Sequence, residues 1–203
     1  MTTKLMKGLN YLVMFVLLNI LWLIGIVIGL FFGGLLPSTY ALIAMYRDTE
    51  LFDGFTSYRQ ISKRFFVLWW KGFKHFKFSV LLFPVAIFIV YLDILLVQQD
   101  QLMKAMFLWP LIALMCYLGL SMVQFAYTET VSGDSIKAKL KAALVAPLLM
   151  PLESLLSMLV FGSFFVLCLR FNWLFFVFAA ALLFVICKML QNGYAKKGLV
   201  MHD

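Results

Sequence analysis

Few side chains in this sequence could do chemistry, and their spacing matches no catalytic motif. The two histidines are His75, which stands among lysines, and His202, next to the last printed residue. No phosphate-binding glycine loop, nucleophile elbow or HExxH zinc motif occurs. We therefore expect a protein that is not an enzyme, with no catalytic residue, no cofactor and no metal.

The three cysteines are Cys116, Cys168 and Cys187, and all lie in long apolar segments. No two of them form the CxxC pair that a zinc or redox motif needs. Cys168 and Cys187 fall near opposite ends of successive apolar segments, too far apart for a disulfide. We expect free thiols that pack as small apolar side chains.

Three polar residues inside apolar segments are candidate functional groups, because such residues in a membrane span commonly mark a functional site. Asn19 lies near the middle of the first segment, where it either hydrogen-bonds another helix or lines a polar site. Asp93 either reaches interfacial water or pairs with Lys104. Glu153 follows Pro151 in the first turn of a predicted helix, where the helix dipole stabilises a carboxylate.

The segments that carry these groups predict the fold class. No charged residue occurs between Lys7 and Arg47, and 65% of the 203 residues are hydrophobic while only 13% are charged. About 20 apolar residues are enough to cross a bilayer. The prediction is an all-α fold, a polytopic integral membrane helix bundle, with residues 1–203 in a single membrane domain.

Five membrane-spanning helices and two basic amphipathic helices are predicted. The spans cover residues 9–30, 78–97, 103–126, 152–169 and 173–190, and the amphipathic helices cover residues 55–76 and 136–149. The short polar turn at 98–101 makes the second and third spans an antiparallel hairpin. Because a straight helix over the whole first uncharged run would exceed the bilayer, a break is expected near Gly33–Pro37, with Pro37 starting a short helix.

The basic residues predict an orientation in the cell membrane. Placing residues 46–77, residues 127–150 and the C-terminus in the cytoplasm puts 13 of the 17 Lys and Arg inside. This arrangement has the N-terminus outside and the C-terminus inside. If the segment from Gly25 to Tyr46 re-entered the membrane, the N-terminus would instead be inside. The net charge of +8 then reflects cytoplasmic loops and not nucleic-acid binding.

Residues 55–76 combine cations with an apolar stripe at three- and four-residue steps, which is typical of a helix in the membrane interface. The candidate lipid-contact residues, expected to meet anionic lipid, are Arg59, Lys63, Arg64, Lys71 and Lys74. A docking surface for a partner helix is the alternative interpretation.

Three glycines, Gly25, Gly29 and Gly33, repeat at four-residue intervals and so share one helix face. Small residues at this spacing let a second helix approach closely in lipid. The alternative is that they only loosen the helix end before Gly34 and Pro37.

Several motifs occur in a recognisable order: Asn19-Ile20-Leu21-Trp22, Pro37-Ser38-Thr39, Met45-Tyr46-Arg47, Tyr58-Arg59 and Tyr91-Leu92-Asp93. In this order they resemble the YesL-like family of small bacterial membrane proteins of unknown function. The resemblance covers nearly the whole chain and is most specific over residues 15–95. It implies five spans and frequent encoding beside carbohydrate ABC-transporter permeases, but no catalytic or ligand residues.

The functional expectation is therefore a non-enzymatic accessory or regulatory component associated with carbohydrate uptake or utilisation. Its expected partners are the lipid bilayer and either an ABC-transporter permease or a second copy of the chain. The alternative is a small-solute or lipid-handling permease that acts as an oligomer. A stand-alone channel is disfavoured, because one chain has too few polar groups in its spans to line a hydrated pore.

Overall fold

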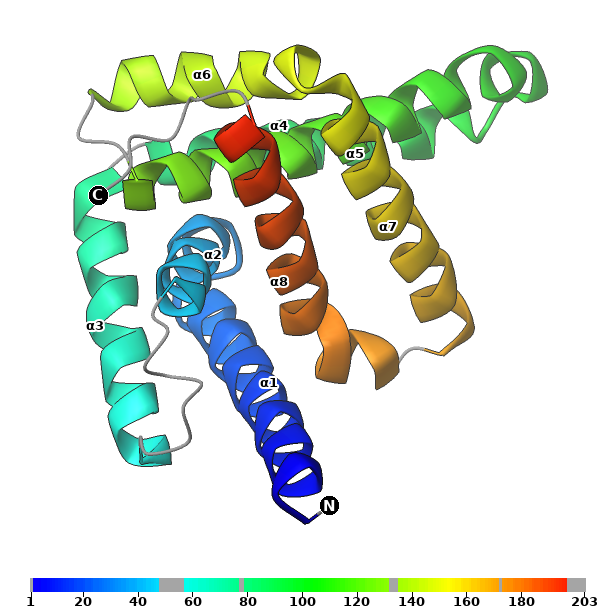
Figure 1. Cartoon of the computed structure of the whole chain (residues 1–203). Coiled ribbons are helices and arrows are strands. Elements are labelled where there is room, and N and C mark those ends of the chain that lie inside the picture. The colour runs from blue at the N-terminus through cyan, green and yellow to red at the C-terminus, as the bar shows by residue number, and fades with distance from the viewer. Residues whose placement is uncertain (1, 48–56, 77–78, 132–134, 172, 197–203) are drawn as a thin grey trace.

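The computed structural model describes residues 2–47, 57–76, 79–131, 135–171 and 173–196. Within these ranges the chain forms eight α-helices and no strand (Figure 1), which confirms the predicted all-α class. The helices are α1 Thr2–Ile28, α2 Phe32–Tyr46, α3 Tyr58–Phe76, α4 Ser79–Val97, α5 Gln101–Val131, α6 Ile136–Leu149, α7 Pro151–Arg170 and α8 Trp173–Lys196.

Four of the described helices are long and apolar enough to cross a membrane. The qualifying segments are Gly8–Ile28, Ser79–Val97, Gln101–Val131 and Pro151–Cys168. In α8 the apolar stretch over the described side chains is Ala179–Ala195. The chain is thus a multi-pass membrane protein with four such helices in its described part, where the sequence predicts five spans.

The helix α5 is longer than the sequence predicts, because residues 127–131 are helical and not part of a loop. The hydroxyl of Thr128 donates to the carbonyl of Phe125 at 2.9 Å, and that of Thr130 donates to the carbonyl of Tyr127 at 2.7 Å. These bonds back to the preceding turn satisfy the threonines inside the helix. No proline interrupts the segment, so the helix continues to Val131.

Within the uncharged segment between Lys7 and Arg47, the chain reverses direction earlier than predicted. The helix α1 ends at Ile28, and Leu30 and Phe31 have positive φ angles of 55° and 61°. Non-glycine residues seldom adopt this conformation, and two in succession turn the chain sharply. The expected break at Gly33–Pro37 is therefore wrong in position, and Pro37 lies inside α2 instead of starting a helix.

The helix α2 returns antiparallel beside α1 and forms the centre of the fold. Trp22 Nε1 donates to Thr39 Oγ1 at 3.3 Å, and farther along the pair the rings of Phe15 and Tyr46 lie 6.3 Å apart. The same helix packs against α3, α4, α5 and α8. Figure 1 views α2 nearly along its axis, with other helices around it. Most of its side chains are buried, which explains why a short helix can be apolar on all sides.

The helices α4 and α5 form the predicted antiparallel hairpin, whose turn projects beyond the rest of the molecule (Figure 1). Asp100 Oδ1 accepts the backbone N–H of Leu102 at 2.8 Å and caps the start of α5. Leu96, Leu102 and Trp109 are exposed at 63%, 71% and 73%. Exposed apolar side chains at this density are expected of helices that face lipid.

The helix α6 covers the predicted segment 136–149, and α3 covers the predicted segment 55–76 from Tyr58 onward. Residues 55 and 56 lie outside the described part of the chain. The apolar stripe of α3 does not face lipid, because it is buried against α2. This stripe consists of Ile61, Phe65, Trp69, Gly72 and Phe76. The helix α6 lies along α5, and its start is capped by Ser135 Oγ, which accepts the N–H of Ala138 at 3.4 Å.

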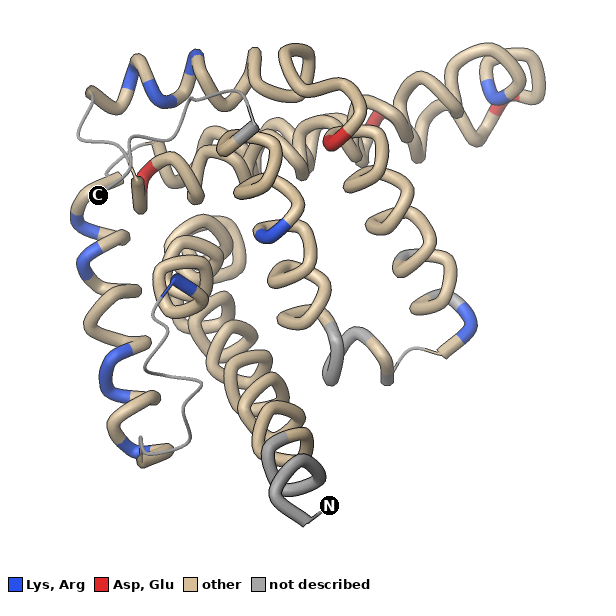
Figure 2. Tube along the Cα trace, viewed as in Figure 1, with Lys and Arg blue, Asp and Glu red and all other residues tan. Residues whose placement is uncertain are grey.

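Most of the described cations gather at one end of the molecule. Figure 2 shows Lys and Arg along α3 and over the first half of α6, which lie near each other. Isolated basic segments lie at the opposite end, at the start of α5 and the end of α7. The helix bundle therefore separates charge along its length, as expected of a membrane protein with a positive side.

Candidate functional site

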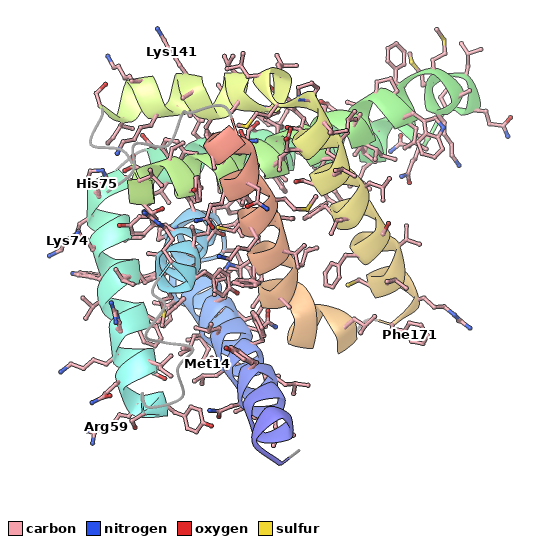
Figure 3. All side chains as sticks on the ribbon, in the orientation of Figure 1. Met14, Arg59, Lys74, His75, Lys141 and Phe171 are labelled. Atoms are coloured by element: carbon pink, nitrogen blue, oxygen red, sulfur yellow. The ribbon has the colours of Figure 1, made fainter. Side chains whose placement is uncertain are left out.

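The outward face of α3 carries the five cations predicted to contact lipid. Arg59, Lys63, Arg64, Lys71 and Lys74 are all exposed. They lie on the side of the helix opposite its buried stripe, and Figure 3 shows the labelled Arg59 and Lys74 pointing away from the bundle.

Large apolar side chains also lie on the exposed side of α3, and they include Val67 and Trp70. Val67 and Trp70 are exposed at 59% and 52%, and Lys74 Nζ lies 5.3 Å from the centre of the Trp70 ring. Cations beside an exposed indole favour a surface that is both anionic and partly apolar.

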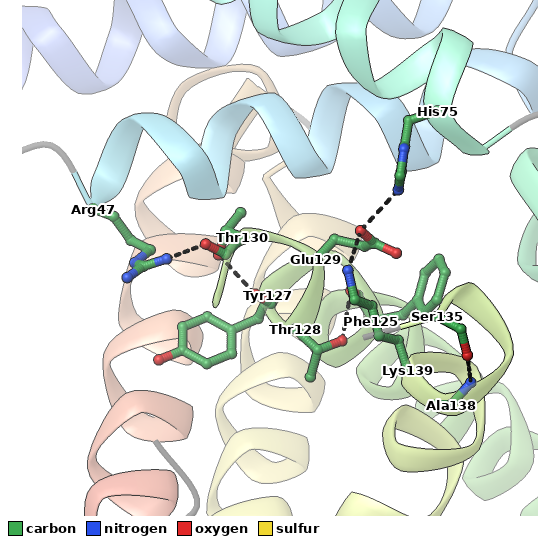
Figure 4. Close-up of polar contacts among 10 residues, drawn as sticks. All are labelled: Arg47, His75, Phe125, Tyr127, Thr128, Glu129, Thr130, Ser135, Ala138 and Lys139. Atoms are coloured by element: carbon green, nitrogen blue, oxygen red, sulfur yellow. Dashed lines mark hydrogen bonds and ion pairs between the residues drawn. The ribbon is translucent and has the colours of Figure 1, made fainter. Parts of the chain in front are cut away.

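A buried ionic cluster lies where α3, α5 and α6 meet (Figure 4). Glu129 Oε2 accepts from Lys139 Nζ at 2.8 Å and lies 3.2 Å from His75 Nε2. The side chains of Glu129 and Lys139 are 3% and 6% exposed, whereas that of His75 is 54% exposed. The cluster therefore joins the basic surface helix to two helices of the bundle.

The end of α2 meets the same region. The guanidinium of Arg47 donates to the carbonyl of Thr130, one residue beyond Glu129 (Figure 4). The ends of α2, α3 and α5 and the start of α6 are thus held together by polar contacts. A buried charge that lost its partner here would be strongly unfavourable.

Sequence reasoning missed this cluster because its members are far apart in the chain and Glu129 falls between the predicted span 103–126 and the predicted helix 136–149. One signal was nevertheless present. Lys139 shares a helix face with Ala143 and Ala146, at steps of four and three residues, and these alanines are buried. A lysine in register with buried alanines indicates a buried cation that needs a carboxylate.

Asn19 is fully buried and joins α1 to α8. Its Oδ1 accepts the backbone N–H of Ala180 at 2.8 Å, while the hydroxyl of Tyr46 donates to the carbonyl of the same residue at 2.6 Å. Side chains from α1 and α2 thus hold both backbone polar groups of Ala180. Of the two interpretations for Asn19, the structure shows an interhelical hydrogen bond.

Asp93 and Glu153 lie in different surroundings. Asp93 is exposed on α4, and within the described part of the chain it makes no ion pair with Lys104. Glu153 is half-buried in the first turn of α7. Its Cγ lies only 3.0 Å from the position that a Cβ on Gly193 would occupy.

Gly25 and Gly29 lie at the contact between α1 and α2, within one chain. A Cβ on Gly25 would lie 2.5 Å from Ser38 Oγ, which accepts a hydrogen bond from Trp69 Nε1 at 3.1 Å. A Cβ on Gly29 would overlap the backbone of Gly34. Gly33 differs, because a Cβ there would meet only ordinary contacts. Gly25 and Gly29, and not Gly33, are therefore the glycines that allow α1 and α2 to approach each other closely.

The described residues include no group of three or more His, Cys, Asp or Glu placed to bind a metal. Cys116, Cys168 and Cys187 are all free thiols. The arrangement defines a class, a multi-pass helical membrane protein with a basic surface helix tied to its bundle by a buried ionic cluster.

Comparison with known proteins finds a family model that is similar to part of the chain. Residues 15–94 match the family model "Protein of unknown function, DUF624". The matched segment includes the second half of α1, all of α2 and α3, and most of α4. No curated protein and no solved structure matches the chain.

Proposed function

We propose that the chain is a non-enzymatic accessory subunit of a membrane complex and that α3 is its docking element. The observation that carries this proposal is the attachment of α3. Its apolar stripe is buried on α2 and its end is tied through His75 to the buried Glu129–Lys139 pair. A helix held in this way presents its cations on a fixed surface, which lowers the entropy lost on binding.

The proposed partners follow from the chemistry of this surface. The five cations and Trp70 suit the anionic headgroups of the cytoplasmic leaflet, where each basic residue contributes roughly 1 kcal/mol. The resemblance to the YesL-like family, whose members are often encoded beside carbohydrate ABC-transporter permeases, supports such a permease as the protein partner. We therefore propose a role in carbohydrate uptake.

The proposed orientation differs from the first of the two sequence-based alternatives. The antiparallel α1–α2 hairpin supports placing the N-terminus on the same side of the membrane as Arg47. Lys4 and Lys7 then join the cytoplasmic cations, and only Lys104 and Arg170 remain outside. Both termini are cytoplasmic in this arrangement.

Cysteine labelling in intact cells tests this orientation. In a background without the three native thiols, cysteines at Gly8 and Lys71 are expected to resist an impermeant maleimide. A cysteine at Gln99, in the α4–α5 turn, should be labelled. Labelling at Gly8 together with protection at Lys71 would return the N-terminus to the outside.

Co-purification from native membranes tests the proposed function. Wild-type protein is expected to recover an ABC-transporter permease. Recovery should fall at least tenfold when Lys63, Arg64, Lys71 and Lys74 are all changed to Gln, because the docking surface loses its charge. A matched control changes the exposed α6 residues Lys137 and Lys141 to Gln and should keep the partner. Equal recovery with both variants would contradict docking through α3.

A permease that acts as an oligomer is the second candidate function. Buried polar atoms without partners on α5, α7 and α8 favour it, because a transported polar solute needs such groups within the bundle. Solute uptake into proteoliposomes by the purified chain alone would support this candidate over the accessory role.

A further inference from the structure

Buried polar atoms without partners collect on three helices. Apart from Glu129 Oε1 in the ionic cluster, they are Ser121 Oγ and both amide atoms of Gln124 on α5, Ser154 Oγ and Ser157 Oγ on α7, and the hydroxyl of Tyr194 on α8. All five residues are at most 7% exposed. None of these atoms hydrogen-bonds to the part of the chain that the structure describes. We call these five residues the polar seam.

Contacts between the three helices bring the seam together. The rings of Tyr127 on α5 and Tyr194 on α8 stack at 5.4 Å. Next to Tyr194, the backbone of Gly193 lies against Glu153, the residue before Ser154 on α7. Tyr194 therefore sits between α5 and the first turns of α7, where these helices also pack on each other.

Helical spacing aligns the remaining members with this contact. Gln124 lies one turn before Tyr127 on α5, Ser121 lies one turn farther, and Ser157 lies one turn after Ser154. Phe125, the neighbour of Gln124, instead contacts Phe76 and Phe83 of α3 and α4. Gln124 thus lies near the side of α5 that carries Tyr127, and Ser121 continues the row of buried polar side chains along α5.

Leaving this seam without partners is unfavourable. A buried amide or hydroxyl with no hydrogen bond keeps its full desolvation cost, and lipid offers no donor or acceptor in place of water. Single exceptions occur in folded proteins, but six such atoms on three packed helices indicate hydrogen-bond partners that the described part of the chain does not supply.

We infer that the polar seam binds small neutral molecules that carry hydroxyl groups, either water or a small polyol. Hydroxyls and a primary amide both donate and accept, which matches the hydroxyl group of such ligands. The five side chains are uncharged, so the seam supplies no counter-ion for an ionic ligand. This site does not depend on docking through α3, and variants of α3 should leave it intact.

The test uses the full chain in detergent and follows its melting temperature with glycerol as the probe. Excluded polyols stabilise any protein in proportion to their concentration, whereas a bound ligand adds a saturable rise. The saturable rise is expected for wild-type protein and for the exposed control Gln101→Met. It should be absent from Gln124→Met and from Ser157→Ala, which remove hydrogen-bonding groups with little change of volume.

Hydroxyl-radical labelling of Tyr194 separates the two sources of the ligand. A saturable glycerol effect identifies a polyol site, while labelling of the buried Tyr194 without a glycerol effect identifies bound water. In either case Gln124→Met should melt below wild-type protein. The inference is overturned if Tyr194 is unlabelled, glycerol acts equally on all variants, and Gln124→Met melts about 2–4 °C higher, the gain expected from removing an orphan amide.

Discussion

Replacing Glu129 by Ala is expected to lower the free energy of unfolding by about 3–5 kcal/mol, because Lys139 would remain buried without its carboxylate. Thermal or urea unfolding of the detergent-solubilised protein measures the loss. The effect should appear also as reduced accumulation in membranes. In contrast, His75→Ala should cost less than about 1 kcal/mol, since the imidazole is half exposed.

A double substitution separates the ion pair from general damage to the fold. Combining Glu129→Ala with Lys139→Met removes both charges, and much of the lost stability should return because Met packs in the space of the lysine chain. A double variant no more stable than Glu129→Ala alone would show that Lys139 does not depend on Glu129. Lys141→Met, at an exposed position of the same helix, is the matched control.

Gly29→Ala is expected to destabilise the protein by about 3 kcal/mol or more, at or beyond the upper end of ordinary overpacking. The added Cβ would overlap the backbone of Gly34, and neither backbone segment can move aside without opening the α1–α2 hairpin. Gly34→Ala should act similarly, since its Cβ would lie 2.5 Å from the carbonyl oxygens of Gly25 and Ile26. Melting temperature and membrane accumulation report the effect.

The control for these glycine variants is Gly162→Ala, because a Cβ at that position meets nothing within 4 Å. It should melt within a few degrees of wild-type protein. Leu30→Ile is not a neutral control, although Leu30 is 82% exposed, because its φ of 55° is strained for a β-branched residue. Normal stability of both Gly29→Ala and Gly34→Ala would disprove the close contact.

Patterns along the chain predicted the helices well, because hydropathy and charge act locally. The segment 136–149 matches α6 residue for residue, and all described residues of the predicted segment 78–97 lie in α4. Proline and glycine chemistry was less informative, since Pro37 lies within a helix and the reversal instead uses Leu30 and Phe31. The spacing of apolar residues along the chain does not show that Leu30 and Phe31 adopt positive φ angles.

The sequence by itself determined the membrane class, the helical segments and the uneven distribution of basic residues. Tertiary structure decided what each helix faces. An amphipathic stripe shows only that α3 must bury one side, and the fold assigns that side to α2 instead of lipid. The contact of Glu129 with His75 and Lys139 likewise arises from packing among three helices. Such contacts join residues that are distant in the chain. The spacing of residues within one helix does not show which other helices become its neighbours.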